Sequence, residues 1–306
     1  MGARETARRR CVAGAAATLL TAGLLAGCAG DTSREPSDDA APAPPSPSRS
    51  TEPPAPTPEL DSIAVIGHSG ATGFGTNPND ASLNVPANSW ATGDNPAVNS
   101  IYQRLLVTHP ALQGHNVNKA ANGSQVYEHL DQAAAAMQEN PVPDVVLLQT
   151  IDNDLRCDGT DRQNQRPFAR DLTDVIRTVM EGSETVQLLI VSQWATVDEY
   201  TATIDELPNA VTLNSGTGPC ATFDPLGRPD PAGRRSLQAI VDMYWRTVEH
   251  TCARFDRCFT DHGAMKEMRV TPEDLTADYS HLSVAGHRKF AELAWLALPD
   301  AIRDRP

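Results

Sequence analysis

A serine and a distant carboxylate–imidazole pair are the residues of this sequence whose types and spacing suit catalysis. Ser69 ends a Gly-x-Ser turn that directly follows the apolar run 63–66, and Asp278 stands three residues before His281. A serine hydroxyl is an effective nucleophile only beside a base, and that base works best when a third group orients it. Ser69, His281 and Asp278 have the residue types of such a nucleophile, base and orienting carboxylate.

Acyl transfer also needs hydrogen-bond donors that hold the developing oxyanion. Two polar turns follow later apolar segments, Asn122-Gly123 and Asp152-Asn153-Asp154. Both turns can present donors toward the serine if the fold brings the ends of their strands to one edge. Asp152 and Asp154 lack the glycine and acidic spacing of a calcium loop, so no metal site is expected there.

Strand and helix patterns alternate along the chain from residue 61, and the polar turns follow the predicted strands. Continuous apolar runs predict buried parallel strands, and apolar residues at helical spacing predict the helices between them. This alternation predicts an α/β fold, a three-layer sandwich with a central parallel sheet, whose ligands lie outside the carboxyl ends of the strands. The expected strands are 62–66, 115–119, 144–149 and 186–192, and the expected helices are 99–108, 125–139, 167–181, 235–255 and 283–298. Residues 195–232 are expected to form a long irregular loop that shapes the substrate cleft.

The four motifs together resemble those of the SGNH hydrolases, the GDSL esterase and lipase superfamily. Gly67-His68-Ser69, Asn122-Gly123, Ile151-Asp152-Asn153-Asp154 and Asp278-Tyr279-Ser280-His281 stand in the family's order and span residues 62–297. The resemblance implies a flavodoxin-like architecture and an acyl-enzyme mechanism without cofactor or metal. It also implies that the oxyanion donors are the backbone N–H groups of Ser69 and Gly123 and the side-chain amide of Asn153.

Two positions depart from the family's pattern. His68 replaces an aspartate beside the serine, which predicts altered local hydrogen bonding rather than loss of activity. Ile151 replaces a glycine before the asparagine, which could tilt the Asn153 amide. His129, His250, His262 and His287 are expected to be surface residues.

The resemblance leaves the acyl group and the alcohol open among small-molecule, lipid and glycan esters. Two alternatives to an esterase remain: a surface lipoprotein that uses the fold as an inactive binding module, and a thioesterase or transacylase with the same triad.

The amino terminus has the pattern of an export signal. Four arginines precede an uncharged apolar run that ends in Leu25-Ala26-Gly27-Cys28, which resembles a bacterial lipobox. We therefore expect a signal segment 1–28 and lipid attachment at Cys28, with an ordinary secretory signal as the alternative. Nine prolines between Asp31 and Leu60 predict a disordered tether, 29–59, before a catalytic domain 60–306. The expected location is the outer face of the cell membrane.

Beyond residue 28 the chain has 21 basic and 38 acidic side chains. Such an acidic balance argues against nucleic acid as a partner, and we expect a monomer. Four cysteines remain, and an even number in an exported domain predicts disulfides. The closeness of Cys252 and Cys258 favours their pairing, leaving Cys157 with Cys220; a zinc site is the weaker reading because no Cys-x-x-Cys spacing occurs.

Overall fold

The computed structural model describes residues 59–303. The predicted signal segment 1–28, its Cys28 and nearly all of the predicted tether 29–59 lie outside the described residues.

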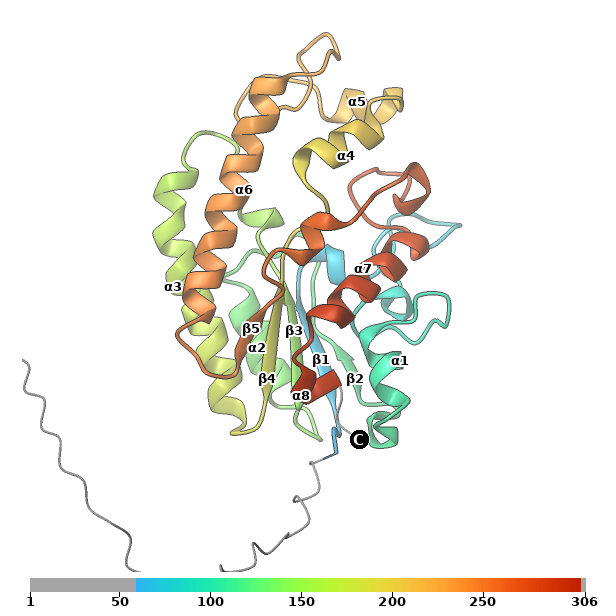
Figure 1. Cartoon of the computed structure of the whole chain (residues 1–306), viewed down its shortest axis with the longest axis vertical. Helices are drawn as coiled ribbons and strands as arrows, with labels where there is room; N and C mark the ends of the chain where they lie inside the picture. Colours follow the sequence, from blue (N-terminus) through green and yellow to red (C-terminus); the bar gives the residue numbers. More distant parts are fainter. Residues whose placement is uncertain (1–58, 304–306) are drawn as a thin grey trace, which may run out of the picture. The chain divides into compact units, whose positions relative to one another are not determined.

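Five parallel strands form one sheet in the order β2-β1-β3-β4-β5 (Figure 1). The strands are β1 (Ile63–Gly67), β2 (Asn116–Asn118), β3 (Val145–Gln149), β4 (Gln187–Val191) and β5 (Cys258–Thr260). Every residue of β3 is buried, because side chains that alternate along a central strand meet helices on both faces.

Helices cover both faces of this sheet. One core, with Val65 and Leu147 from the sheet, includes residues of α1 (Ile101–Leu106) and α7 (Val284–Ala297). The other, with Ile66 and Leu148, includes residues of three helices: α2 (His129–Ala136), α3 (Asp161–Gly182) and α6 (Pro231–Cys252). The predicted three-layer α/β sandwich with a central parallel sheet is confirmed.

The predicted irregular loop 195–232 is wrong in part. It contains two helices, α4 (Val197–Ile204) and α5 (Pro208–Leu213), above the carboxyl edge of the sheet in Figure 1. Thr196 caps α4 by accepting a hydrogen bond from the Glu199 N–H, a local signal that Gly- and Pro-rich surroundings obscure. A last short helix, α8 (Asp300–Arg303), follows α7.

Two further boundaries differ from expectation. Helix α3 was expected to begin at Pro167 but begins at Asp161, so that Pro167 lies inside its second turn. A proline there removes a single intrahelical hydrogen bond, and the long amphipathic helix tolerates the loss. Strand β5 was not expected, since three residues are too short for a recognisable apolar pattern.

Disulfide bonds join Cys157 to Cys220 and Cys252 to Cys258, which is the pairing that the sequence favours. The first spans 63 positions of the chain and ties the segment after β3 to the segment after α5. Among residues 59–303, no cluster of three or more His, Cys, Asp or Glu side chains could hold a metal ion.

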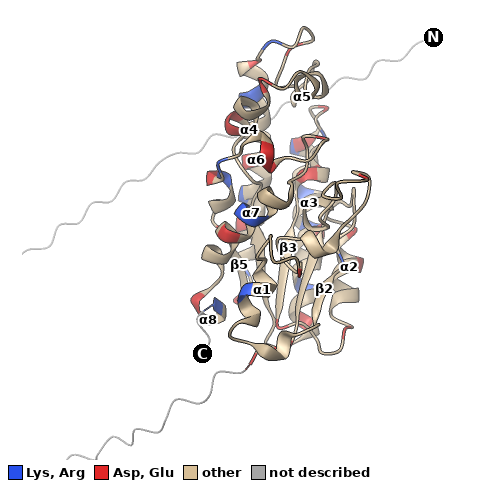
Figure 2. Cartoon of the chain, turned by 90° about the vertical axis from the view of Figure 1, so that its right-hand side faces the viewer, with Lys and Arg blue, Asp and Glu red and all other residues tan. Residues whose placement is uncertain are grey.

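Two surface properties bear on location and partners. No helix in the described part combines the length and apolar character needed to cross a membrane. Figure 2 shows acidic and basic residues interspersed over the helices, without a continuous basic stripe on the face in view.

Candidate active site

The turn after β1 places Ser69 at the carboxyl edge of the sheet, at the start of a short 3₁₀ helix (Ser69–Ala71). Gly67 has a φ of +132°, and a Cβ added there would come within 2.1 Å of the Gln149 carbonyl oxygen on β3. Only glycine fits both constraints. The close approach of β1 and β3 thus fixes the point at which the chain turns toward Ser69.

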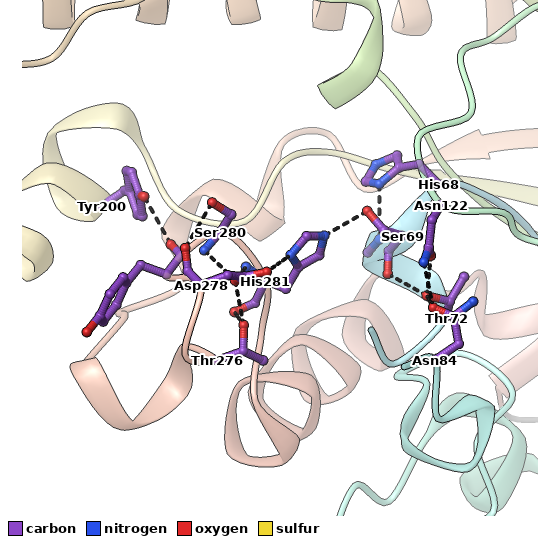
Figure 3. A network of polar contacts seen from close by, with 12 residues as sticks. His68, Ser69, Thr72, Asn84, Asn122, Tyr200, Thr276, Asp278, Ser280 and His281 are labelled. Carbon is purple, nitrogen blue, oxygen red and sulfur yellow. Dashed lines mark hydrogen bonds and ion pairs between the residues drawn. The ribbon is translucent and has the colours of Figure 1, made fainter. Parts of the chain in front are cut away.

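The structure brings Ser69, His281 and Asp278 into one hydrogen-bonded line (Figure 3). The Ser69 Oγ lies 2.8 Å from His281 Nε2, and His281 Nδ1 lies 2.7 Å from Asp278 Oδ2. Since a carboxylate can only accept, the Nδ1–H donates to Asp278 and leaves Nε2 free to accept the serine proton. The ring of Phe74 packs on the imidazole, with centroids 4.7 Å apart.

Asp278 is held ionised by its own turn. Partial burial alone would favour the neutral carboxyl, but hydrogen bonds from His281, from Thr276 Oγ1 at 2.6 Å and from the Ser280 N–H at 2.9 Å outweigh it. Together they hold the pKa of Asp278 well below its usual range. A permanently charged partner suits an imidazole that must stabilise a proton taken from serine.

Ser69, Gly123 and Asn153, the three residues expected to supply oxyanion donors, all line one pocket. Within the described residues, neither the Ser69 N–H nor the Gly123 N–H donates to another group. The Asn153 side-chain amide donates one hydrogen to the Ser124 carbonyl oxygen at 3.1 Å. This bond orients the amide and leaves its second hydrogen to donate to a ligand. The turn of Gly123 has a φ of +75°, a conformation that glycine adopts without strain.

Ile151, at the position where the family has a glycine, has a backbone conformation that favours glycine. Its φ is +94°, a value that is strained for a β-branched residue. Its side chain is fully buried in the core beneath α3 and α6, and this packing holds the strained turn. The following turn, Asp152–Asp154, consequently still presents Asn153 to the pocket.

His68 is buried beneath the nucleophile and makes its own contacts there. Its Nδ1 accepts a hydrogen bond from the Gly70 N–H at 3.1 Å, so the proton of the neutral ring is on Nε2, 3.1 Å from Asp152 Oδ2. Burial, helped by the nearby His281, lowers the pKa of His68 to about 3. A neutral His68 thus lies in contact with both the serine turn and the turn that carries Asn153.

Asp152 lines the pocket, and 41% of its side chain is accessible. The part of its hydration that the pocket removes raises its pKa, against the opposing effects of His281 and of a hydrogen bond from Gln193. The residue therefore contributes an ionisable carboxyl to the pocket floor.

The site opens into a pocket of about 670 Å³, within the usual range for small-molecule sites. Its polar floor carries the reacting groups, and six apolar side chains also line it: Phe74, Leu155, Trp194, Val197, Leu237 and Val241. Of these, Val197 lies in the segment 195–232 that was expected to shape the cleft. Leu237 and Val241 come from α6, which had no local sequence signal for a pocket.

The prediction that four histidines lie at the surface is wrong for two of them. His129 and His287 are buried, with at most 1% of each exposed, and burial lowers the pKa of each to about 3. Both lie on buried faces of their helices, α2 and α7, and a polar residue type gives no sequence signal for such a placement. His250 and His262 are exposed as expected.

No family model matches the chain, and no curated protein matches it. Among solved structures, a family 3 carbohydrate esterase from Clostridium thermocellum is 16% identical, with a TM-score of 0.47, over 79% of this chain and 97% of the other. A GDSL-like lipase from Parabacteroides merdae is 14% identical, with a TM-score of 0.45, over 79% and 98%. An acetyl xylan esterase from Geobacillus stearothermophilus is 18% identical, with a TM-score of 0.39, over 78% and 94%.

At these identities the similarity concerns the fold alone and does not extend to the reaction or the substrate. The solved structures similar to this chain thus include a carbohydrate esterase and a GDSL-like lipase.

Proposed function

We propose that the protein is an exported serine esterase that hydrolyses carboxylic esters through an acyl-enzyme intermediate. The observation that carries the proposal is the line of two short hydrogen bonds, Ser69 to His281 at 2.8 Å and His281 to Asp278 at 2.7 Å, at the floor of an open pocket. Few arrangements other than nucleophilic catalysis need an unprotonated imidazole nitrogen facing a serine hydroxyl.

In the first half of the reaction, the Ser69 Oγ attacks the ester carbonyl carbon while His281 Nε2 takes its proton. The negative charge that develops on the carbonyl oxygen is held by the N–H groups of Ser69 and Gly123 and by the Asn153 amide. As the tetrahedral intermediate collapses, His281 returns the proton to the departing alcohol, leaving the acyl group on Ser69.

In the second half, His281 takes a proton from a water molecule that attacks the acyl-enzyme. The same donors hold the second oxyanion, and collapse releases the acid and restores the Ser69 hydroxyl. Asp278 stays ionised throughout and keeps the Nδ1–H directed toward itself.

Hydrolysis of p-nitrophenyl butyrate by the full chain tests this function. Ser69→Ala is expected to lower kcat by at least about 10³-fold, because it removes the nucleophile. Ser82→Ala changes an exposed serine that does not line the pocket and is the matched control. Equal hydrolysis by wild type and Ser69→Ala would reject the mechanism, and a wild-type rate no higher than that of the buffer alone would favour a binding module.

We propose further that the esterase acts outside the cytoplasm, tethered through Cys28. Two disulfides support an oxidising compartment. The lipobox-like sequence supports the tether. Cys28→Ser is expected to move the protein from the membrane fraction to the soluble fraction, and unchanged fractionation would refute the lipid anchor.

A further inference from the structure

The apolar wall of the pocket comes from elements on the β4 side of the sheet. Leu237 and Val241 lie one turn apart on the same face of α6 and line the pocket. The later residues Tyr244 and Val248 of that helix pack against the sheet. In Figure 1, the first half of α6 extends beyond the carboxyl edge of the strands, which frees its apolar side chains for the pocket.

The segment after β4 completes this wall. Trp194 and Val197 line the pocket beside α6, and the Val197 N–H donates to Gln238 Oε1 at 2.9 Å, which joins the start of α4 to α6. Leu155 adds an apolar side chain from the turn after β3. We call these five residues, Leu155, Trp194, Val197, Leu237 and Val241, the apolar wall.

Covalent and polar contacts hold the apolar wall in place before any ligand arrives. The Cys157–Cys220 disulfide itself lines the pocket and ties the turn after β3 to the segment after α5. The ring of Trp194 meets the ring of Tyr200 edge-on at 5.5 Å, and the Tyr200 hydroxyl donates to the Tyr279 carbonyl oxygen at 3.0 Å. A wall fixed in this way binds an apolar group without a large ordering cost.

The charges around the pocket restrict what it can hold. No lysine or arginine is among the residues that line it, whereas the carboxyl of Asp152 opens onto its floor. A ligand with a phosphate or carboxylate group near the reacting carbon would lose its hydration there and meet no cation. The pocket chemistry therefore favours an uncharged ligand.

We propose that the apolar wall binds the acyl chain of the ester, so that the enzyme prefers uncharged, medium-length acyl esters to acetyl esters and to anionic ones. The proposal rests on the esterase function above. A pocket of about 670 Å³ is larger than an acetyl group requires, and we expect the optimum at roughly four to eight acyl carbons. Up to that optimum, each methylene is expected to raise kcat/KM by up to about fourfold.

A series of p-nitrophenyl esters from acetate to palmitate, which share one alcohol, isolates the acyl chain. The wild type is expected to show its highest kcat/KM for the butanoyl to octanoyl esters. It is expected to be at least tenfold slower, in kcat/KM, with the mono-p-nitrophenyl ester of hexanedioic acid than with the hexanoyl ester. A maximum at acetate, or equal rates with the anionic ester, would overturn the proposal.

Val241→Trp tests the wall directly, because the larger side chain fills the space that the acyl chain would occupy. The ratio of hexanoyl to acetyl kcat/KM is expected to fall at least tenfold. Ile240→Trp is the matched control, since Ile240 neighbours Val241 but does not line the pocket. Leu237→Phe provides a second filling variant if thermal melting shows that Val241→Trp does not fold.

The outcomes separate this proposal from the esterase function. Equal ratios in Val241→Trp, Leu237→Phe and Ile240→Trp, with hydrolysis still dependent on Ser69, would overturn the acyl wall and leave the esterase in place. A series of alkyl acetates of increasing alcohol length tests whether the apolar wall binds the alcohol instead. If Val241→Trp lowers kcat/KM more for longer alcohols, the proposal is also overturned. Hydrolysis that does not depend on Ser69 would instead remove the function on which the proposal rests.

Discussion

Asp154 supports the active site from below, as a carboxyl buried in the turn that carries Asn153. Its side chain accepts a hydrogen bond from the Val126 N–H at 3.1 Å, and its carbonyl oxygen accepts one from the Tyr244 hydroxyl at 3.1 Å. Burial raises the pKa of Asp154 to about 7, against the lowering effects of the Val126 N–H and of Arg156. A carboxyl that binds its proton more tightly in the folded state couples stability to pH.

Between about pH 4 and pH 7 the unfolded chain has lost the Asp154 proton while the folded chain keeps it. The free energy of unfolding is therefore expected to fall as pH rises through this window and to level above it, by up to about 4 kcal/mol. Asp154→Asn cannot ionise, and its amide oxygen still accepts from Val126. We expect the variant to lose much of the difference between urea midpoints at pH 5 and pH 8.

Asp158→Asn is the control for this measurement, because Asp158 is exposed and its pKa is lowered by hydrogen bonds from Thr160. That carboxyl is already ionised in both states at pH 5, so the pH difference should match the wild type. An Asp154→Asn variant with the wild-type difference would show that Asp154 does not hold a proton in the folded state.

At the scale of elements, the segment between β4 and α6 positions the catalytic turn as well as the pocket wall. Tyr200 on α4 donates to the carbonyl oxygen of Tyr279, which lies between Asp278 and His281 and has a φ of +60°. Asn214 donates to the same hydroxyl at 3.3 Å. Tyr200 thus acts as a positioning residue through a backbone that supplies two catalytic groups.

Tyr200→Phe keeps the ring against Trp194 and removes only the hydroxyl. We expect kcat for p-nitrophenyl butyrate to fall roughly three- to tenfold, the effect of one lost hydrogen bond, with KM nearly unchanged. The rates are divided by the concentration of active sites, so that loss of folded protein does not count. Tyr127→Phe, at an exposed tyrosine, is the control; an unchanged kcat in Tyr200→Phe would reject the positioning role.

At the scale of the whole molecule, one parallel sheet gathers segments from residue 69 to residue 281 at a single edge. The strand patterns predict this gathering because they are local: residues 145–148 of β3 are all apolar, and the strand ends shortly before the turn with Asn153. The side-chain types and order of the four motifs then suffice to predict which residues meet at the edge.

Other features depend on contacts that no local pattern encodes. The contact between His68 and Asp152 joins two turns more than eighty residues apart. The wall residues Leu237 and Val241 have the spacing of any amphipathic helix, and only the fold shows that the first half of α6 extends beyond the sheet. The same holds for His129 and His287, which are polar by type yet buried in the layers beside the sheet. Sequence therefore predicts the reacting groups better than it predicts the surfaces around them.

The most direct test of the central claim is to locate a covalent adduct on the nucleophile. The full chain is treated with diisopropyl fluorophosphate, which reacts with activated serines whatever the natural substrate, and is analysed by intact mass and peptide mapping. We expect one phosphoryl group per chain, carried by Ser69, absent in Ser69→Ala and formed at least about 10³-fold more slowly in His281→Ala. An adduct on another residue, no adduct, or equal labelling of wild type and His281→Ala would contradict a Ser69 nucleophile activated by His281.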